Sequence, residues 1–209
     1  MRFSSSPAGH AGRWWNPRLG RASRQPGQWY RGAAQVDLLV PERLAGSGRR
    51  AVTVPPHDGQ SLRRVRGMEA SLVDHDMMPV PALDANDPRT IKLQVAGPMA
   101  LIVSKAHKLH ERLGEGRGDR IQPKDAHDLY RLLLAVQAET LVQVARRLLG
   151  DDMSREATTD AIGYLQELFA DERAPGPSLV ADAETIAGTP DLARVQSAAL
   201  ARRLIDQLT

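Results

Sequence analysis

Charged side chains in three segments of the chain have types and spacings that suit chemistry on phosphates. The first is Asp37, a carboxylate inside the apolar run V-D-L-L-V over residues 36–40. A carboxylate among apolar neighbours is costly to bury unless it meets a cation or a metal ion. Strand-borne acids of this kind hold Mg²⁺ in metal-dependent phosphoryl transfer. The alternative interpretation is that Asp37 faces solvent at the edge of a sheet.

The second segment is a basic stripe formed by Lys105, Lys108 and Arg112, spaced by three and four residues. These spacings place side chains on one face of a helix. Lys105 borders the apolar face that contains Ile102, whereas Lys108 points further outward. A lysine at the border of the core could reach a phosphate as a point charge. The alternative is a solvated helix face.

The third segment contains Asp125 and Asp128, three residues apart and in line with Leu132 and Val136. Their spacing tilts both carboxylates toward the core side of one helix. Acids in the first turns of a helix also suit its dipole, which is one interpretation. The other is that one of the two aspartates accepts a hydrogen bond from Lys105 or positions its neighbour.

Other reactive residue types form weaker patterns. His107 and His110, with Glu111, could be drawn as a metal site, but their spacing differs from that of the metalloprotease helix motif. The glycine loop over residues 46–50 (GSGRR) could contact a phosphate, and its serine lacks the context of a nucleophile. No P-loop or dinucleotide-binding fingerprint occurs.

The elements that would position these residues fall into two groups. Apolar or alternating runs predict strands over residues 35–40, 51–54, 70–74 and 91–95, and a basic helical turn over residues 62–68. Pro41 ends the first strand. The run I-K-L-Q-V over residues 91–95 alternates apolar and polar side chains, which indicates a half-buried strand.

From Gly97 the apolar spacing becomes helical. The helical face contains Met99, Ile102, Ala106, Leu109 and Leu113. Helices are predicted over residues 98–113, 123–136, 141–149, 154–170, 178–187 and 190–208, with a break at 175–177 and Thr189 as the cap of the last helix. Short strands followed by helices predict an α+β fold.

Composition excludes several classes of protein. The 209 residues include no cysteine, which excludes a disulfide scaffold, a cysteine nucleophile and an iron–sulfur site. No apolar run approaches the roughly 18 residues of a membrane span, and no apolar stretch of a signal peptide follows the start. We therefore expect a cytoplasmic protein that makes no membrane contact.

Charge is distributed unevenly along the chain. Residues 1–66 contain twelve arginines, no lysine and three acidic residues, a balance of +9, whereas residues 67–209 have a balance of −6. Such a basic region suits nucleic acid as a partner. The alternative is a basic leader over residues 1–33, disordered or loosely docked and rich in Gly, Pro, Ser and Arg. A misassigned start codon would also produce such a leader.

Three segments together resemble a known family. They are V-D-L-L-V-P over residues 36–41, I-K-L-Q-V-A-G-P-M-A-L-I-V-S-K over 91–105 and Q-P-K-D-A-H-D-L-Y-R-L-L over 122–133. This order resembles bacterial nucleotidyltransferase-fold (polymerase-β-like) proteins of the AbiEii-like abortive-infection toxin type and their uncharacterised relatives. The resemblance covers roughly residues 34–137, with the leader before it and a helical C-terminal region over residues 138–209 packing on this core.

The resemblance implies an Mg²⁺-dependent transfer of a nucleotidyl group from an NTP to an acceptor. Asp37 then matches a metal carboxylate of the family. Lys105 matches the lysine near the nucleotide phosphates, and Lys108 adds a second cation. Asp125 and Asp128 match the acids of the later motif, which support the site or position substrate. A small mixed β-sheet followed by a helical half is the implied fold.

The sequence departs from this family pattern upstream of Asp37. The family core begins with G-S and a D-x-D pair that supplies two metal carboxylates, whereas residues 1–36 contain no acidic residue. We therefore expect a remnant of a nucleotidyltransferase, a truncated gene product or a chain with a misread start, in which nucleotidyl transfer is impaired or absent. We also expect the sheet to lack its first strands and so to have an exposed edge or groove. The alternatives are a non-catalytic module that binds nucleic acid or a protein through the basic segment 1–66, and helices after residue 139 that pack on a partner.

Overall fold

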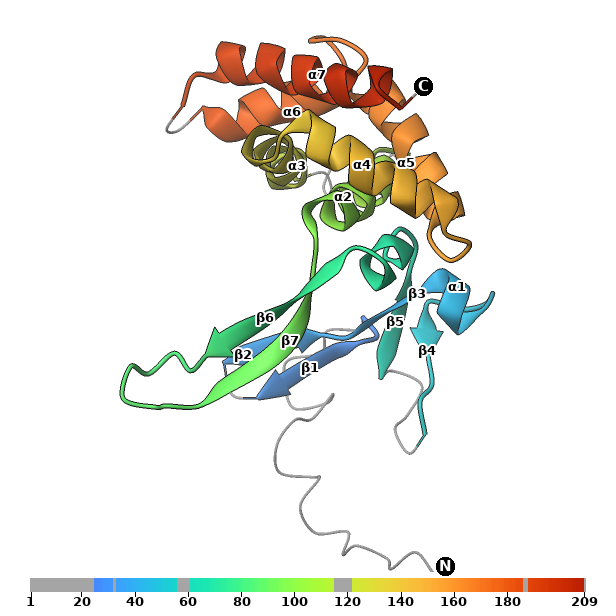
Figure 1. The fold of residues 1–209 in the computed structure, drawn as a ribbon, viewed down its shortest axis with the longest axis vertical. Coiled ribbons are helices and arrows are strands. Elements are labelled where there is room, and N and C mark those ends of the chain that lie inside the picture. Colours follow the sequence, from blue (N-terminus) through green and yellow to red (C-terminus); the bar gives the residue numbers. More distant parts are fainter. Residues whose placement is uncertain (1–24, 32, 56–60, 115–121, 186–187, 209) are drawn as a thin grey trace, which may run out of the picture. The chain divides into compact units, whose positions relative to one another are not determined.

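The computed structural model describes residues 25–31, 33–55, 61–114, 122–185 and 188–208. The chain divides into two compact units, Met1–Val65 and Arg66–Thr209, and each unit is described by itself (Figure 1). The boundary falls inside the segment 34–137 that the resemblance treats as one core. Strands dominate the first unit and helices the second, which confirms the α+β class.

The first unit contains two small sheets. Its elements are β1 (Gln28–Arg31), β2 (Ala34–Asp37), β3 (Leu39–Pro41), α1 (Glu42–Ala45), β4 (Ala51–Val52) and β5 (Leu62–Val65). β1 and β2 pair antiparallel, and the second sheet has the order β3-β5-β4, with β3 parallel and β4 antiparallel to β5. The indole Nε1 of Trp29 on β1 donates a hydrogen bond of 2.8 Å to the carbonyl of Ser61, immediately before β5.

Several sequence predictions for this unit are wrong. Residues 35–40 form two strands in different sheets, because the backbone of Leu38 between them bonds to Gly27 and Arg63. Residues 62–65 form strand β5 instead of a helical turn, because pairing with β3 and β4 outweighs a weak local preference. Residues 25–31, which belong to the expected leader over residues 1–33, include β1, whereas residues 1–24 and 32 lie outside the described residues.

The second unit consists of a hairpin and a group of helices. Its elements are η2 (Glu69–Leu72), β6 (His75–Pro81), β7 (Thr90–Ala96), α2 (Pro98–Gly114), α3 (Pro123–Ala135), α4 (Ala138–Gly150), α5 (Arg155–Leu168), α6 (Pro175–Glu184) and α7 (Pro190–Asp206). The predicted strand over residues 91–95 is confirmed within β7. The strand predicted over residues 70–74 is wrong, since residues 69–72 form a 3-10 helix. Strand β6 was not predicted.

The helices pack around a single apolar core. α2 packs against α3 and α5, α3 against α6, and α6 against α7. Of the predicted apolar face of α2, Met99, Ile102, Ala106 and Leu109 are at most 1% exposed, whereas Leu113 is partly buried against the core. Burial of each large side chain contributes about 1.5–3 kcal/mol, so this face fixes α2 in the centre of the unit.

Two helix ends differ from their predictions. α6 begins at Pro175, where a break was expected, because proline suits the first position of a helix. Thr189 occupies the N-cap position of α7, as predicted, but its side chain makes no capping hydrogen bond. Among the described residues no helix is long and apolar enough to span a membrane.

The start of α2 is held by a carboxylate from outside the helix. Asp74 Oδ2 accepts a hydrogen bond of 2.8 Å from the backbone N–H of Ala100, and the Asp74 carbonyl accepts another of 2.8 Å from Gly97. A Cβ on Gly97 would lie 2.3 Å from Asp74 Oδ1, so a larger side chain would displace the carboxylate. This contact fixes where β7 ends and where the helix that contains Lys105 begins.

Candidate functional site

Helices α2 and α3 bring four of the five predicted site residues together. Lys105 and Lys108 lie on α2, and Asp125 and Asp128 lie in the first two turns of α3. The two helices are in contact. α3 begins at Pro123, so Asp125 falls where an acid suits the helix dipole, and its side chain also faces α2. We call these residues, together with Arg112, the α2–α3 cluster.

Asp125 is the buried centre of the α2–α3 cluster. Its side chain is 4% exposed, and Lys108 Nζ lies 2.7 Å from its Oδ1. Lys105 Nζ lies 3.6 Å from the same oxygen, and Arg112 Nη1 donates to Oδ2. A buried carboxylate is costly unless it is paired and hydrogen-bonded. Three cations from successive turns of α2 satisfy that requirement.

Asp128 holds Lys105 from the next turn of α3. Lys105 Nζ donates to Asp128 Oδ2 at 2.6 Å, which confirms the prediction that one of the two aspartates accepts a hydrogen bond from this lysine. Burial opposes ionisation of Asp128. The hydrogen bond from Lys105 and the charges of Lys105, Lys124 and Arg131 outweigh it and lower the pKa of Asp128. Asp128 is therefore a carboxylate that fixes the position of an ammonium group.

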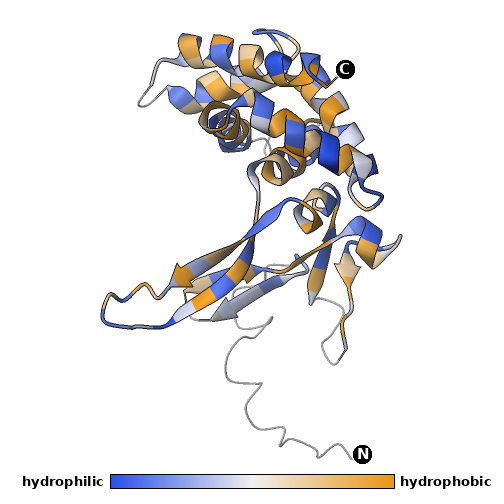
Figure 2. Ribbon diagram, in the orientation of Figure 1, coloured by the Kyte–Doolittle hydropathy of each residue, from blue (hydrophilic) through white to orange (hydrophobic). Residues whose placement is uncertain are grey.

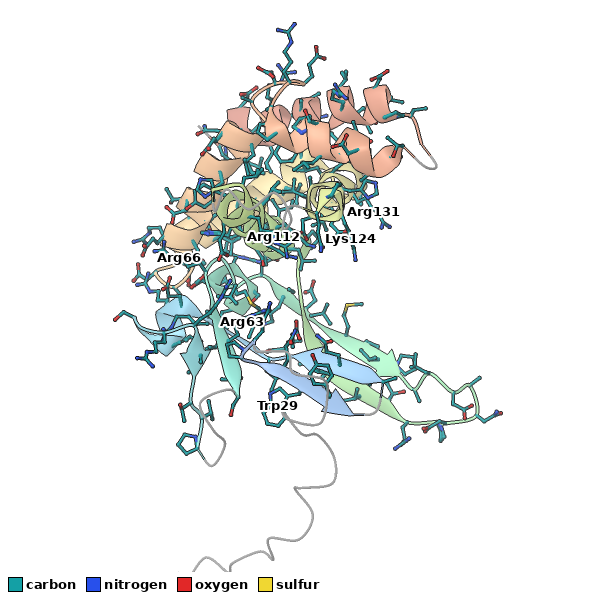
Figure 3. All side chains as sticks on the ribbon, turned by 180° about the vertical axis from the view of Figure 1, so that it is seen from behind. Trp29, Arg63, Arg66, Arg112, Lys124 and Arg131 are labelled. Carbon is teal, nitrogen blue, oxygen red and sulfur yellow. The ribbon has the colours of Figure 1, made fainter. Side chains whose placement is uncertain are left out.

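Positive charge exceeds negative charge at the α2–α3 cluster. Three residues of this environment were not among the predicted site residues: Arg112, which the i, i+7 spacing from Lys105 had placed on the basic stripe, and Lys124 and Arg131, which flank Asp128 on α3 (Figure 3). Three cations contact the two carboxylates, and the charges of Lys124 and Arg131 also act on Asp128. Such a surplus of positive charge can hold an anion, and phosphate is among the anions that lysine and arginine recognise in proteins.

Asp37 lies in the first unit and in a different environment. Its side chain is 38% exposed, it accepts a hydrogen bond of 2.9 Å from Gln35 Nε2, and Arg63 Nη2 lies 3.8 Å from its Oδ2. The interpretation that Asp37 faces solvent is therefore confirmed. A single exposed carboxylate with an arginine partner does not fit a resident Mg²⁺, and within the described ranges no cluster of three or more His, Asp or Glu could hold a metal ion.

The histidines have structural partners. His107 Nε2 lies 2.8 Å from the carbonyl oxygen of Ala157, and the ring of His110 stacks on Tyr164 with centroids 3.8 Å apart. These contacts connect α2 to α5 and account for the His-x-x-His spacing without a metal.

Two arginines of the basic N-terminal segment, Arg63 and Arg64, have partners within the first unit. Arg63 Nη1 bonds to Gln25 Oε1, and Arg64 donates to the carbonyls of Ala45 and Arg49 beside the glycine loop. These guanidinium groups thus hold the first unit together. The remaining arginines before residue 25 lie outside the described part of the chain.

A comparison of the chain with protein-family models, with curated proteins and with solved structures finds no match. The function must therefore be argued from the geometry of the site.

Proposed function

We propose that the chain is a nucleotidyltransferase-like protein that binds the phosphates of a nucleoside triphosphate at the α2–α3 cluster. The observation that carries the proposal is the contact of Lys105 Nζ with Asp128, 2.6 Å away, beside the buried Asp125. These residues come from two of the three segments that carry the family resemblance, residues 91–105 and 122–133. Their convergence supports a shared site.

The residues of the cluster divide into two roles. Lys105 and the more exposed Lys108 supply the charge that attracts phosphate oxygens. An ammonium group has three N–H donors, so Lys105 keeps donor capacity beyond its contacts with Asp125 and Asp128. The two aspartates are positioning residues, because a carboxylate repels a phosphate but holds a lysine in one orientation.

We propose further that nucleotidyl transfer is impaired. A two-metal displacement needs several carboxylates, and no acidic residue precedes Asp37 in the sequence. Asp37 itself has Gln35 and Arg63 as partners. Mg²⁺ enters the proposal only as the ion that accompanies the triphosphate, and the acceptor is undefined.

Calorimetric titration of the full chain with each of the four NTPs and Mg²⁺ tests the binding site. We expect one NTP or more to bind, and the Lys105→Ala variant to bind it at least about tenfold more weakly, a loss of about 1.4 kcal/mol. The matched control is Arg202→Ala, which removes one exposed cation from α7 and should leave affinity unchanged. Equal affinity of Lys105→Ala and the unaltered chain, or no binding of any NTP, would contradict the proposal.

Label transfer tests the second part. The chain is incubated with labelled NTPs, Mg²⁺ and total tRNA or cell extract, and we expect no covalent label. Transfer that disappears in the Asp37→Ala variant would show an active enzyme and overturn the proposed impairment, while leaving the binding site intact.

The alternative function is nucleic-acid binding by residues 1–66. The charge of +9 in this segment favours it, and its affinity for RNA or DNA should fall steeply as salt increases. Binding that does not respond to salt, or no binding, would exclude this alternative. Because Lys105 lies outside the segment, Lys105→Ala should leave nucleic-acid binding unchanged, which separates the two functions.

A further inference from the structure

The β6–β7 hairpin is a two-stranded sheet. In the part of the chain that the structure describes, β6 and β7 pair only with each other, and nearly all their residues are exposed. Figure 1 shows the hairpin extending from the start of α2. A two-stranded sheet is marginally stable in water, and three or more strands are usually needed. Further pairing would therefore stabilise the hairpin.

One face of the hairpin is largely apolar. Residues opposite each other in an antiparallel pair share a face, and the register places Met78 opposite Leu93, Val80 opposite Ile91 and Asp76 opposite Val95. The five apolar side chains of this face are 38–58% exposed, and apolar colours alternate along β7 in Figure 2. The prediction of a half-buried strand at residues 91–95 is thus wrong within one copy of the chain, although the alternating pattern that suggested it is present.

The backbone bonds show which groups of each strand point outward. Gly97 N–H donates to the Asp74 carbonyl at one end of the hairpin, and Ala82 N–H donates to the Arg89 carbonyl at the other. In an antiparallel pair, hydrogen-bonded and non-hydrogen-bonded positions alternate. The odd-numbered residues of β6 and the even-numbered residues of β7 therefore direct their N–H and C=O groups away from the hairpin.

The two outer edges differ in their capacity to pair. On β6 the outward positions include Pro79 and Pro81, which have no N–H to donate, so this edge is blocked. On β7 they are Thr90, Lys92, Gln94 and Ala96, each with a backbone donor and acceptor. The hairpin thus has one edge at which a further strand can be added.

We propose that a second copy of this chain pairs with β7 through its own β7, antiparallel and with Leu93 at the two-fold axis. This register pairs the whole of Thr90–Ala96 and uses every outward backbone group. It places Lys92 opposite Gln94 of the second copy, so no like charges meet. It also places Ile91 opposite Val95 of the second copy, which continues the apolar face.

The resulting sheet has four strands, with a proline-blocked strand at each outer edge. The two apolar faces lie on the same side because the two-fold axis is perpendicular to the sheet. An interface in which the same strand serves both subunits is self-complementary and closes at two copies. A dimer, and no larger assembly, follows from this geometry.

The mass of the full chain in solution tests the proposal. Light scattering on a size-exclusion column at about 50 µM should give twice 22.9 kDa. Gln94→Pro removes one outward N–H but no hydrogen bond inside the hairpin, because residue 94 is an outward position like those of Pro79 and Pro81 on β6. This variant should be a monomer. The matched control Gln94→Ala keeps the N–H and should remain a dimer. Circular dichroism of both variants shows whether the fold is retained.

A cross-link tests the register. The chain has no cysteine, so Leu93→Cys introduces a single thiol that meets its own copy at a non-hydrogen-bonded position, with Cβ atoms about 4.5–5.5 Å apart. Mild oxidation should join nearly all chains in pairs. In the control Thr90→Cys the two thiols lie about 20 Å apart along the strands, and little cross-linking is expected.

Two results would overturn the proposal. One is a monomer at the stated concentration, which would leave the edge to a different protein or to another part of the chain. The other is a dimer that persists in Gln94→Pro and in which Leu93→Cys cross-links no faster than Thr90→Cys, which would place the interface elsewhere.

Discussion

Asp125 and Asp37 are both aspartates near the end of a regular element, yet their surroundings differ in burial and in charge. Asp125 in α3 is 4% exposed and contacts Lys105, Lys108 and Arg112 of α2. Asp37 at the end of β2 is 38% exposed, with Arg63 as its ion-pair partner at 3.8 Å. The second unit thus buries the carboxylate of Asp125 among its cations, whereas the first unit leaves the carboxylate of Asp37 exposed to solvent.

The difference in burial shows where the fold holds charged side chains in place and where they could also bind a ligand. Removal of water strengthens the attraction between Asp125 and its three cations, so these side chains are held in fixed positions before any ligand arrives. At Asp37 water screens the pair with Arg63, and the carboxylate has no such fixed surroundings. Preorganised charge therefore lies at the α2–α3 cluster.

The largest expected effect is the loss of Asp125. Asp125→Ala leaves three cations without their common carboxylate, and breaking a buried ionic cluster costs about 3 kcal/mol. Urea denaturation should show a free energy of unfolding lower by about this amount. Asp206→Ala, which removes an exposed aspartate from α7, is the control and should change the value by less than about 0.5 kcal/mol. If Asp125→Ala lowered the free energy of unfolding by less than about 1 kcal/mol, the buried aspartate would stabilise the fold no more than the exposed Asp37 does.

Asp74 offers an intermediate case. Its side chain is 9% exposed, accepts a hydrogen bond from Ala100 at the start of α2, and lies 3.5 Å from Arg147. Asp74→Ala removes this cap and should lower the free energy of unfolding by about 1–2 kcal/mol. The control Asp76→Ala alters an exposed aspartate two residues away. Equal melting temperatures of the two variants would show that the cap contributes little.

The helices, and which charged residues share one face of a helix, could be predicted from the sequence because both depend on local spacing. Pro98, Gly114 and the apolar period of α2 define that helix within the chain itself. Which helix faces Lys105 depends on tertiary packing, so the spacing left open whether Asp125 and Asp128 meet α2 or merely suit the helix dipole.

The strands were harder to predict because their partners lie far along the chain. β6 contains Pro79 and Pro81, which usually argue against a strand, and they are accommodated because their positions face the outer edge. β5 contains Arg63 and Arg64 and has no apolar alternation that local reasoning could use. Its strand character comes from β3 and β4.

A smaller, pH-dependent effect is expected at Lys105. The pKa of Asp128 is lowered in the folded protein, so its ion pair with Lys105 contributes stability that is present above the ordinary aspartate pKa of 3.8 and is lost as the pH falls through the lowered folded-state value. Lys105→Ala should therefore reduce stability by about 1 kcal/mol near neutral pH. The difference from the unaltered chain should shrink as the pH falls below 3.8.

Urea denaturation across this pH range measures that difference. Arg202→Ala, which removes an exposed cation from α7, is the control and should follow the unaltered chain at every pH. A deficit in Lys105→Ala that stays constant with pH would mean that the lysine acts through packing of its methylene groups, because only the ionic contact depends on the charge of Asp128.

The smallest effect is expected at Asp37, and it sets the lower end of the comparison. Asp37→Asn keeps the shape of the side chain and an acceptor for Gln35 while it removes the charge that faces Arg63 at 3.8 Å. Exposed ion pairs contribute about 0–1 kcal/mol, so the free energy of unfolding should change by less than about 0.5 kcal/mol. Asp125→Asn, measured alongside, makes the same chemical change at the buried position and should cost several times more. A cost at Asp37 equal to that at Asp125 would mean that solvent does not screen the strand carboxylate, and that Asp37 and Arg63 hold the first unit together as the α2–α3 cluster holds the second.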